Sequence, residues 1–322
     1  MESKTDISII SPIYNEEENI RNFVNAVYST MSSQNCNWEL ILVDDGSTDS
    51  SRSLLRSLAK DHHNLRVLLL SKNFGQTPAI QAGFDHAKGS VIVTLDSDLQ
   101  NDPKDIPLLV NKLKNENLDL VVGWRKDQKD DFFLRNFPSM IANYLIGSIT
   151  GVKLNDYGCS LKAYNSKILK EIKLYGEMHR FIPAWMATKI PSSKIKELVV
   201  THHPRVAGIS KYGISRTYRV FIDLISVFFF MKFFSKPGHF FGLIGISLSI
   251  IGSIMLLYLV SLKIFYGLDI GDRPLLVAGT LLVVVGVQFI SLGVIGEILS
   301  RTYFASSKEK SYFIRWDSGD KE

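Results

Sequence analysis

Residues 91–100 read VIVTLDSDLQ, an apolar run that leads directly into two aspartates one residue apart. A short run of aliphatic and β-branched residues that stops at polar ones is typical of a buried strand ending in a loop. Asp96 and Asp98 alternate along the chain, so they can point two carboxylates at one hard cation. Taken alone, such a pair more often caps a helix or faces solvent than binds a metal. The residues around the other strands are therefore needed to decide between these roles.

The same strand belongs to an alternating series of strands and helices in the first 122 residues. The expected strands are residues 6–13, 39–43, 66–70, 91–95 and 119–122. Apolar residues at helical spacing and capping residues predict helices over 19–30, from the 44–49 cluster to Lys60, over 77–87 and over 106–115. Alternation with short connections predicts an α/β fold with a mostly parallel sheet and helices on both faces.

Polar clusters follow four of the expected strands, at residues 14–16, 44–45, 96–98 and 123–125. Because ligands of open α/β sheets bind at the carboxyl ends of the strands, we expect these clusters to share one crevice. Several carboxylates on one sheet edge repel each other unless a cation or hydrogen-bond donors offset them. This favours a metal site at the aspartate pair.

A metal at this edge suggests a phosphate-rich ligand, yet neither G-x-G-x-x-G nor G-x-x-x-x-G-K-[ST] occurs in the chain. Neutralisation of the phosphates would then come from the metal and from basic side chains, since guanidinium groups bind phosphate in a bidentate manner. Each basic candidate could equally be an ordinary surface cation. The candidates are Arg125, Arg135, Arg205 and Lys211.

The chain has 322 residues, 46% of them apolar and 21% charged, with a net charge of +5 and two cysteines. These values exclude disordered, collagen-like and disulfide-scaffold proteins. Two stretches carry no formal charge, the 23 residues 240–262 and the 22 residues 275–296. Each exceeds the roughly 20 residues that a membrane-spanning helix needs, so the pair predicts a transmembrane hairpin. Basic residues flank the outer ends of both stretches, which places both chain termini in the cytoplasm.

Five motifs in order resemble glycosyltransferase family 2. They are SPIYNE at residues 11–16, VDDGS at 43–47, NFGQ at 73–76, DSDLQ-x-DP at 96–103 and NDYGC at 155–159. The chain is most similar to the polyprenyl-phosphate glycosyltransferase branch, which includes dolichol-phosphate mannose synthase, the undecaprenyl-phosphate glucosyltransferases and the aminoarabinose transferase of lipid A modification. The resemblance extends through the two C-terminal apolar stretches.

This resemblance implies a GT-A catalytic domain over residues 1–212, an interfacial amphipathic helix over 213–236, the hairpin over 237–300 and a cytoplasmic tail over 301–322. The aromatic residues of the tail suggest either a strand pair or packing at the interface. The expected location is the bacterial plasma membrane, with a multi-pass chain. The expected activity is inverting, Mg²⁺- or Mn²⁺-dependent sugar transfer from a nucleotide-sugar to the phosphate of a polyprenol such as undecaprenyl phosphate.

The resemblance also assigns roles to single residues. The residues expected to hold the nucleotide are Pro12, Tyr14, Glu16, Asp44, Asp45 and Asp96. The expected metal ligands are Asp96, Asp98 and Gln100, and the catalytic candidates are Asp98 and Asp156. Asp156 could act as a base, position the acceptor, or simply cap the turn into Gly158. The residues expected to meet donor or acceptor phosphate are Arg125, Arg135, Arg205, Ser210 and Lys211.

Several alternatives remain open from the sequence. The donor is expected to be a UDP-hexose or a UDP-amino sugar, with GDP-mannose as the second possibility. A processive polysaccharide synthase is disfavoured because Tyr312 stands where its Gln-x-x-Arg-Trp motif needs glutamine. An inactive nucleotide-binding membrane scaffold is the alternative from another class, and no nucleic-acid partner is expected. Small residues at four-residue spacing, such as Gly245 and Ser249, suggest either a homo-oligomer, possibly a tetramer, or packing within the hairpin.

Overall fold

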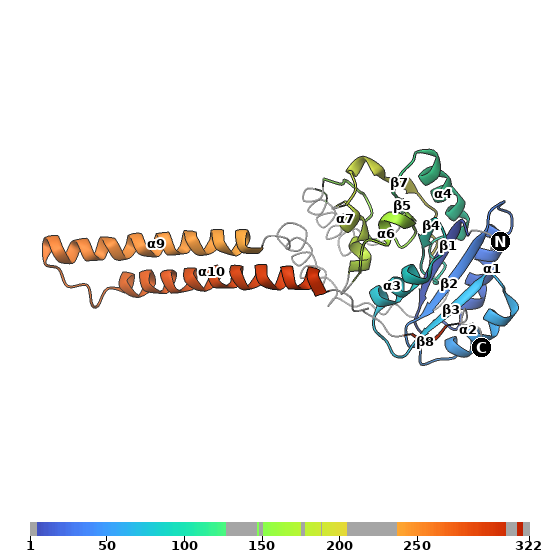
Figure 1. Cartoon of the computed structure of the whole chain (residues 1–322), viewed down its shortest axis with the longest axis horizontal. Coiled ribbons are helices and arrows are strands. Elements are labelled where there is room, and N and C mark those ends of the chain that lie inside the picture. The colour runs from blue at the N-terminus through green and yellow to red at the C-terminus, as the bar shows by residue number, and fades with distance from the viewer. Residues whose placement is uncertain are drawn as a thin grey trace. The chain divides into compact units, whose positions relative to one another are not determined.

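A computed structural model describes residues 5–126, 147, 151–174, 178–187, 189–204, 237–306 and 314–317. The chain forms two compact units, one of Met1–Ile225 with Lys310–Glu322 and the other of Ser226–Glu309. Figure 1 shows the first unit as a sheet covered by helices and the second as a pair of long helices. The predicted interfacial helix over 213–236 lies outside the described residues.

The described part of the first unit contains an eight-stranded sheet with the order β7-β5-β6-β4-β1-β2-β3-β8. The strands are β1 Ile7–Ile13, β2 Trp38–Asp44, β3 Leu65–Leu70, β4 Val91–Thr94, β5 Leu120–Trp124, β6 Lys162–Asn165, β7 Ile195–Val199 and β8 Ile314–Asp317. Neighbours β4, β1, β2 and β3 are parallel, as are β5 and β7. The predicted mostly parallel sheet is confirmed, but β6 runs antiparallel between β4 and β5.

Helices cover both faces of this sheet (Figure 1). The longer ones are α1 Ile20–Met31, α2 Ser51–Asp61, α3 Gln76–His86 and α4 Ile106–Asn115; α6 Ser166–Leu169 and α7 Ile182–Met186 are short. Ile9 of β1 belongs to one core cluster with apolar residues of α1, α2 and α4. The next residue, Ile10, faces the other side, where it meets Gly83 of α3 so closely that a Cβ there would lie 2.3 Å from its methyl group. Alternation along β1 therefore supplies both layers of the core.

The C-terminal tail returns to the first unit as strand β8. It pairs antiparallel with β3, with Trp316 opposite Leu69 and Ile314 opposite Leu70. Of the two possibilities that the sequence left for the aromatic tail, the structure shows the strand pair. The chain thus leaves the sheet after β7, passes through the second unit and rejoins the sheet at its other edge.

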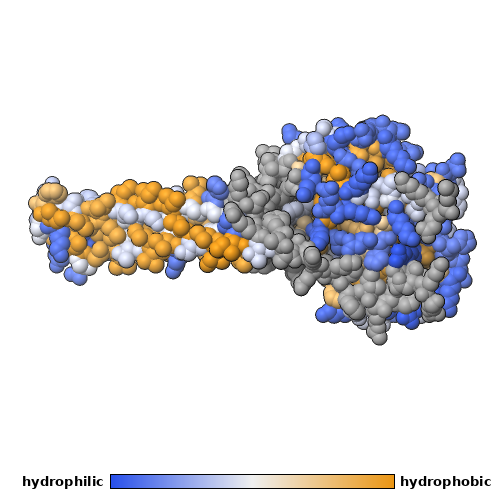
Figure 2. Space-filling model, in the orientation of Figure 1, coloured by the Kyte–Doolittle hydropathy of each residue, from blue (hydrophilic) through white to orange (hydrophobic). Residues whose placement is uncertain are grey.

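The second unit contains helices α9, Pro237–Tyr266, and α10, Pro274–Ser306. Both are long and apolar enough to cross a membrane, and each contains an 18-residue stretch with a mean hydropathy of 2.4, within Pro237–Tyr266 and within Pro274–Leu299. Large apolar side chains such as Leu243 and Val277 are each 70% exposed on them. Figure 2 shows hydrophobic residues along the visible surface of both helices, as expected for segments that face lipid.

Glycines line the contact between α9 and α10. They form three facing pairs, and successive glycines are seven positions apart on each helix: Gly238 with Gly293, Gly245 with Gly286, and Gly252 with Gly279. A Cβ on Gly245 would lie 2.5 Å from the carbonyl oxygen of Gly286, so only glycine lets the backbones approach this closely. Ser249 lies in the same contact, against Gly286. The small residues Gly245 and Ser249 therefore pack within the hairpin.

Gly245→Leu is expected to disrupt this hairpin, because the new side chain would collide with the backbone of α10. Overpacking of this kind costs about 1–3 kcal/mol. Gly242→Leu, on the same helix, is the matched control, since a Cβ at Gly242 meets no atom of the described residues within 4 Å. The measurement is the fraction of protein that stays monodisperse after extraction in mild detergent. Equal losses for the two variants would contradict the glycine contact.

Candidate active site

The predicted convergence of polar clusters at one sheet edge is confirmed for the described residues. Strands β5, β6, β4, β1 and β2 are consecutive neighbours, and the residues that follow β1, β2, β4 and β5 emerge at the same edge. This edge carries Tyr14, Asp45, Asp96 and Arg125 in four different loops. Sheet order therefore gathers residues that are up to about a hundred positions apart.

The loops after β2 and β3 are locked together at Asp45. Its two carboxylate oxygens accept hydrogen bonds from the backbone N–H groups of Phe74, at 2.7 Å, and Gly75, at 2.9 Å. Burial raises the pKa of Asp45 to about 6, and the charge of Asp44 adds to this, although the two N–H groups oppose it. Gly46 has a φ of 74°, and a Cβ there would lie 2.3 Å from backbone atoms of the β3 loop. The VDDGS and NFGQ motifs thus form one structural unit.

Asp44 is fully buried and pairs with Arg52 of α2, whose Nε lies 2.8 Å from Oδ2. The Arg52 guanidinium also donates to the carbonyl oxygen of Leu70 at the end of β3. Asp44, which the resemblance implies is a nucleotide ligand, thus has an ion-pair partner within the fold.

The loop after β1 is tied to the start of α2. Asn15 has a positive φ of 52° and donates its backbone N–H to Ser47 Oγ at 2.9 Å. The Glu16 carboxylate accepts from the side chain of Asn19 at 2.7 Å. Tyr14 is 37% exposed, and Pro12 is half-buried within β1. This side of the edge thus presents an exposed aromatic ring beside buried carboxylates.

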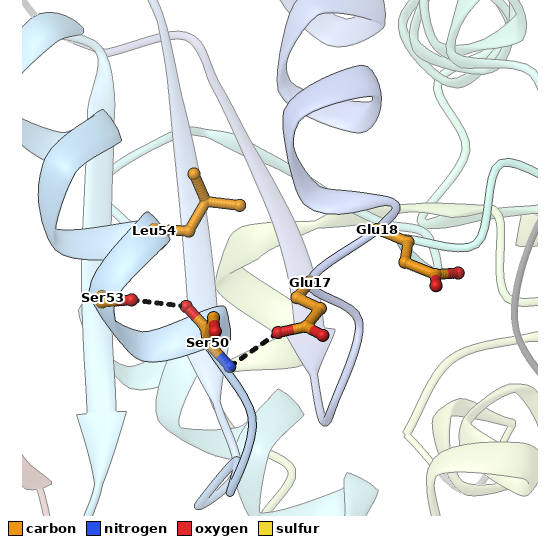
Figure 3. A pocket seen from close by; sticks show the side chains of 5 residues that line it. All are labelled: Glu17, Glu18, Ser50, Ser53 and Leu54. Atoms are coloured by element: carbon orange, nitrogen blue, oxygen red, sulfur yellow. Dashed lines mark hydrogen bonds between the residues drawn. The ribbon is translucent and has the colours of Figure 1, made fainter.

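A shallow pocket lies next to this loop, between the N-terminal ends of α1 and α2 (Figure 3). Its lining residues are Glu17, Glu18, Ser50, Ser53 and Leu54. Glu17 accepts a 2.8 Å hydrogen bond from the backbone N–H of Ser50, which joins the two helix starts. None of the predicted site residues lines this pocket.

Asp96 and Asp98 lie directly after β4, as predicted. Asp96 accepts a 3.0 Å hydrogen bond from the side-chain amide of Gln76, and Asp98 accepts one of 3.1 Å from the backbone N–H of Gln100. Asp98 is only 7% exposed. Burial raises the pKa of Asp96 to about 6, and the Asp98 charge raises it further, against the opposing effects of Ser160, Lys162 and Arg125. Two carboxylates that destabilise each other are the chemistry that a divalent cation relieves.

The protein ligands for such a cation are few. Within the described ranges, no group of three or more His, Cys, Asp and Glu side chains is placed to hold a metal ion. Mg²⁺ sites commonly use one or two carboxylates and take their remaining ligands from substrate phosphates and water. The aspartate pair fits a site of that kind.

Arg125 and Asp156 form a bidentate ion pair across the end of β5. Arg125 Nε lies 2.7 Å from Asp156 Oδ2, and Nη2 lies 2.9 Å from Oδ1. The backbone N–H of Gly158 also donates to Oδ1, at 3.1 Å, so Asp156 does cap this turn. Burial alone would raise the pKa of Asp156, but the hydrogen bonds and charge of Arg125 outweigh it and hold that pKa below its ordinary value. Asp156 is consequently a weak base.

Some contacts at this edge carry no signal in the sequence. Gln76 binds Asp96, Glu197 of β7 accepts the backbone N–H groups of Asn155 and Asp156, and Lys162 is buried at the start of β6. A four-residue strand with a buried lysine lacks the apolar pattern by which strands are recognised. The candidates Arg135, Arg205, Ser210 and Lys211 lie outside the described residues.

The model of the family "Glycosyl transferase family 2" matches residues 8–173. The chain belongs to this family. It is 52% identical over 311 residues to the dodecaprenyl-phosphate galacturonate synthase of Rhizobium johnstonii, covering 96% of this chain and 92% of the relative. It is 33% identical over 311 residues to the undecaprenyl-phosphate 4-deoxy-4-formamido-L-arabinose transferase of Shewanella sediminis, covering 96% and 91%. The protein is therefore a glycosyltransferase of the polyprenyl-phosphate branch.

Solved structures agree on the fold. Glucosyl-3-phosphoglycerate synthase from Mycobacterium tuberculosis in complex with UDP has a TM-score of 0.54 at 20% identity, covering 70% of this chain and 80% of that one. The same enzyme with Mn²⁺, UDP and phosphoglyceric acid has a TM-score of 0.53 at 20% identity, covering 70% and 78%. The expected GT-A-like α/β fold is confirmed.

The raised pKa of Asp45 predicts a gain of stability on acidification. A pKa of about 6 in the folded protein, against about 4 in the unfolded chain, means that the folded state binds this proton more tightly. Stability from this group is therefore present below pH 4 and is lost as the pH rises through 6. We expect the Tm of the ligand-free protein, followed by scanning fluorimetry in detergent, to rise more between about pH 7.5 and 5 in the wild type than in Asp45→Asn. The same change of Tm with pH in the wild type and in Asp45→Asn would contradict the raised pKa of Asp45.

Proposed function

We propose that this glycosyltransferase moves galacturonate from UDP-galacturonate to the phosphate of a membrane polyprenol, with inversion at the anomeric carbon. The observation that carries the proposal is the 52% identity to a dodecaprenyl-phosphate galacturonate synthase, because it extends over 96% of the chain and thus includes the membrane hairpin. A uronic acid specifies further the UDP-hexose or UDP-amino sugar that the sequence analysis expects. The second candidate is a UDP-linked 4-amino-arabinose derivative, which the relatives at 33–34% identity favour.

The acceptor phosphate carries an anionic oxygen near neutral pH, so the nucleophile needs positioning more than deprotonation. We assign this positioning to Arg125, which Asp156 holds rigidly through both carboxylate oxygens. Asp156 thus acts through Arg125 and not as a base. The basic candidates Arg135, Arg205 and Lys211, together with the Ser210 hydroxyl, would complete the proposed phosphate contacts.

Asp96 and Asp98, with Gln100, would hold Mg²⁺ or Mn²⁺. When bound, the cation would stabilise the negative charge of the leaving nucleoside diphosphate as a Lewis acid. The chain's own contribution is to keep two mutually repelling carboxylates at the strand end, with Gln76 orienting Asp96 and the Gln100 N–H orienting Asp98. Tyr14 and the Asp45 loop would hold the nucleotide.

For the membrane, we propose that both ends of the hairpin face the cytoplasm of a bacterial cell. Strand β8 joins the same sheet as β1 to β7, so the chain must cross the bilayer an even number of times. Basic residues near the outer ends of α9 and α10 then select the cytoplasmic side. A homo-oligomer stays a prediction, which cross-linking in membranes tests.

The proposed donor is tested by a turnover panel. Purified full-length protein in detergent receives polyprenyl phosphate, Mn²⁺ and one nucleotide-sugar at a time: UDP-galacturonate, UDP-galactose, UDP-glucose, a UDP-4-amino-arabinose derivative or GDP-mannose. The proposal expects lipid-linked sugar from UDP-galacturonate at a rate at least tenfold above the others. Preferred turnover of the arabinose derivative would establish the second candidate instead.

A further inference from the structure

Lys162 is a buried cation at the candidate site to which neither the sequence nor the mechanism above gives a role. It is the first residue of β6 and pairs with Thr94 of β4 and Val122 of β5. Asp96 and Arg125 follow the ends of those two strands, so Lys162 lies between the aspartate pair and the Arg125–Asp156 ion pair. The residue is 3% exposed.

The Lys162 ammonium makes no hydrogen bond and no ion pair to the residues that the structure describes. Burial lowers its pKa, while the charges of Asp156 and Asp96 act in the opposite direction from a distance. Both of these carboxylates already have closer partners, Arg125 for Asp156 and Gln76 for Asp96. Lysines are almost never fully buried unless paired. The Lys162 Nζ is not among the fully enclosed polar atoms that lack a partner in the described residues, so it keeps a small accessible surface at the candidate site. The site thus retains a cation that an incoming anion would satisfy.

We propose that Lys162 binds an anionic oxygen of the nucleotide-sugar donor and positions it at the aspartate pair. The inference rests on the proposed function for the nucleotide-sugar donor. Two groups of the donor offer this chemistry, the diphosphate and the carboxylate of a uronic acid. A charge-assisted hydrogen bond to either contributes about 1.5–3 kcal/mol, which corresponds to a 10- to 100-fold effect on affinity.

The test measures affinities by isothermal titration calorimetry with the full-length protein in detergent and Mn²⁺. The ligands are UMP, UDP, UDP-galactose and UDP-galacturonate. The variants are Lys162→Met, which removes the charge, and Lys162→Arg, which keeps it. Lys167→Met, at an exposed lysine of α6, is the matched control.

Lys162→Met is expected to weaken the binding of UDP-galacturonate at least tenfold and to leave the affinity for UMP unchanged. Lys162→Arg should recover part of the lost affinity, and Lys167→Met should bind all four ligands like the wild type. Equal weakening of UDP and both UDP-sugars identifies the diphosphate as the partner. Weakening of UDP-galacturonate alone identifies the carboxylate. Unchanged affinities, or equal losses for all four ligands including UMP, would overturn the proposal.

Stability provides the second readout. Removing an unpaired buried charge is neutral or stabilising, so the ligand-free Tm of Lys162→Met should equal or exceed that of the wild type. A merely structural lysine would instead lower the Tm and leave ligand selectivity intact, which would also overturn the proposal. Lys162→Gln, which is neutral but polar, replaces the Met variant if the latter does not fold. Because UMP and UDP carry no transferable sugar, they remain informative even if galacturonate proves not to be transferred.

Discussion

Asp98→Asn is expected to reduce sugar transfer by about three orders of magnitude or more. Asp98 is buried beside Asp96, and the mutual repulsion of the two carboxylates makes them fit a divalent cation. Metal stabilisation of a leaving group contributes several kcal/mol, and each 1.36 kcal/mol is tenfold in rate. Asparagine keeps an oxygen that can accept the Gln100 N–H bond, so the loop geometry should survive. The measurement is transfer of labelled sugar to polyprenyl phosphate with saturating Mn²⁺.

Asp102→Asn is the matched control for this variant. Asp102 lies in the same loop, where its side chain accepts the backbone N–H of Lys104 and contacts His203, and asparagine also serves well as a helix cap. We expect near wild-type transfer and an unchanged Tm from the control, and a Tm for Asp98→Asn that equals or exceeds that of the wild type, because the repulsion of Asp96 is removed. Robust transfer by Asp98→Asn in the presence of EDTA would refute the metal role.

The second large effect is expected at the ion pair between Arg125 and Asp156. The pair is partly buried, with side-chain exposures of 20% for Arg125 and 14% for Asp156. Removing one partner of a fully buried pair destabilises a protein by about 3–5 kcal/mol, so a smaller loss is expected here, whereas replacing both partners is often neutral. Arg125→Met and Asp156→Asn should therefore each lower the Tm, and the double variant should recover much of it. Transfer should fall about a hundredfold in both single variants and stay low in the double variant. The Arg125 guanidinium is absent from Arg125→Met and from the double variant, and in Asp156→Asn it is no longer held in place.

This set of variants also separates a base from a positioning residue. If Asp156 acts through Arg125, Arg125→Lys retains charge but loses the bidentate geometry, and transfer falls while the pH profile keeps its shape. If Asp156 is the base, Asp156→Asn removes the acid limb of the pH–rate profile and Arg125→Lys shifts that limb to higher pH. The second pattern would contradict the positioning role.

Much of the fold follows from the sequence because local patterns decide it. Strands β1 to β5 are short apolar runs such as VIVT, each ended by polar residues, and the helices between them show apolar residues at helical spacing. The insertion of β6 between β4 and β5 could not be predicted, because KAYN has no strand signal and its pairing is decided by tertiary contacts. Two uncharged stretches predict the hairpin. The pairing of glycines, which recur every seven positions on each helix, requires knowing which faces of α9 and α10 meet.

The candidate site shows the same division. Asp96 and Asp98 are recognisable because they end a strand, and the position of strand ends in a parallel sheet then brings them near Asp45 and Arg125. The roles of Gln76 and Lys162 could not be predicted in this way, since Gln76 reaches Asp96 from α3 and Lys162 acts on Asp96 only through its charge, from β6. Residue type and spacing predict the chemistry of one loop. Identifying the partners that other helices and strands contribute requires the three-dimensional structure.

The most direct test of the account is the product formed by the purified full-length wild-type protein from UDP-galacturonate, Mn²⁺ and polyprenyl phosphate, analysed by mass spectrometry of the lipid fraction. The account predicts a polyprenyl phosphate that has gained one galacturonate residue, formed together with an equal amount of UDP and abolished by EDTA. UDP release without a sugar-bearing lipid, or no turnover with any nucleotide-sugar of the panel, would contradict it.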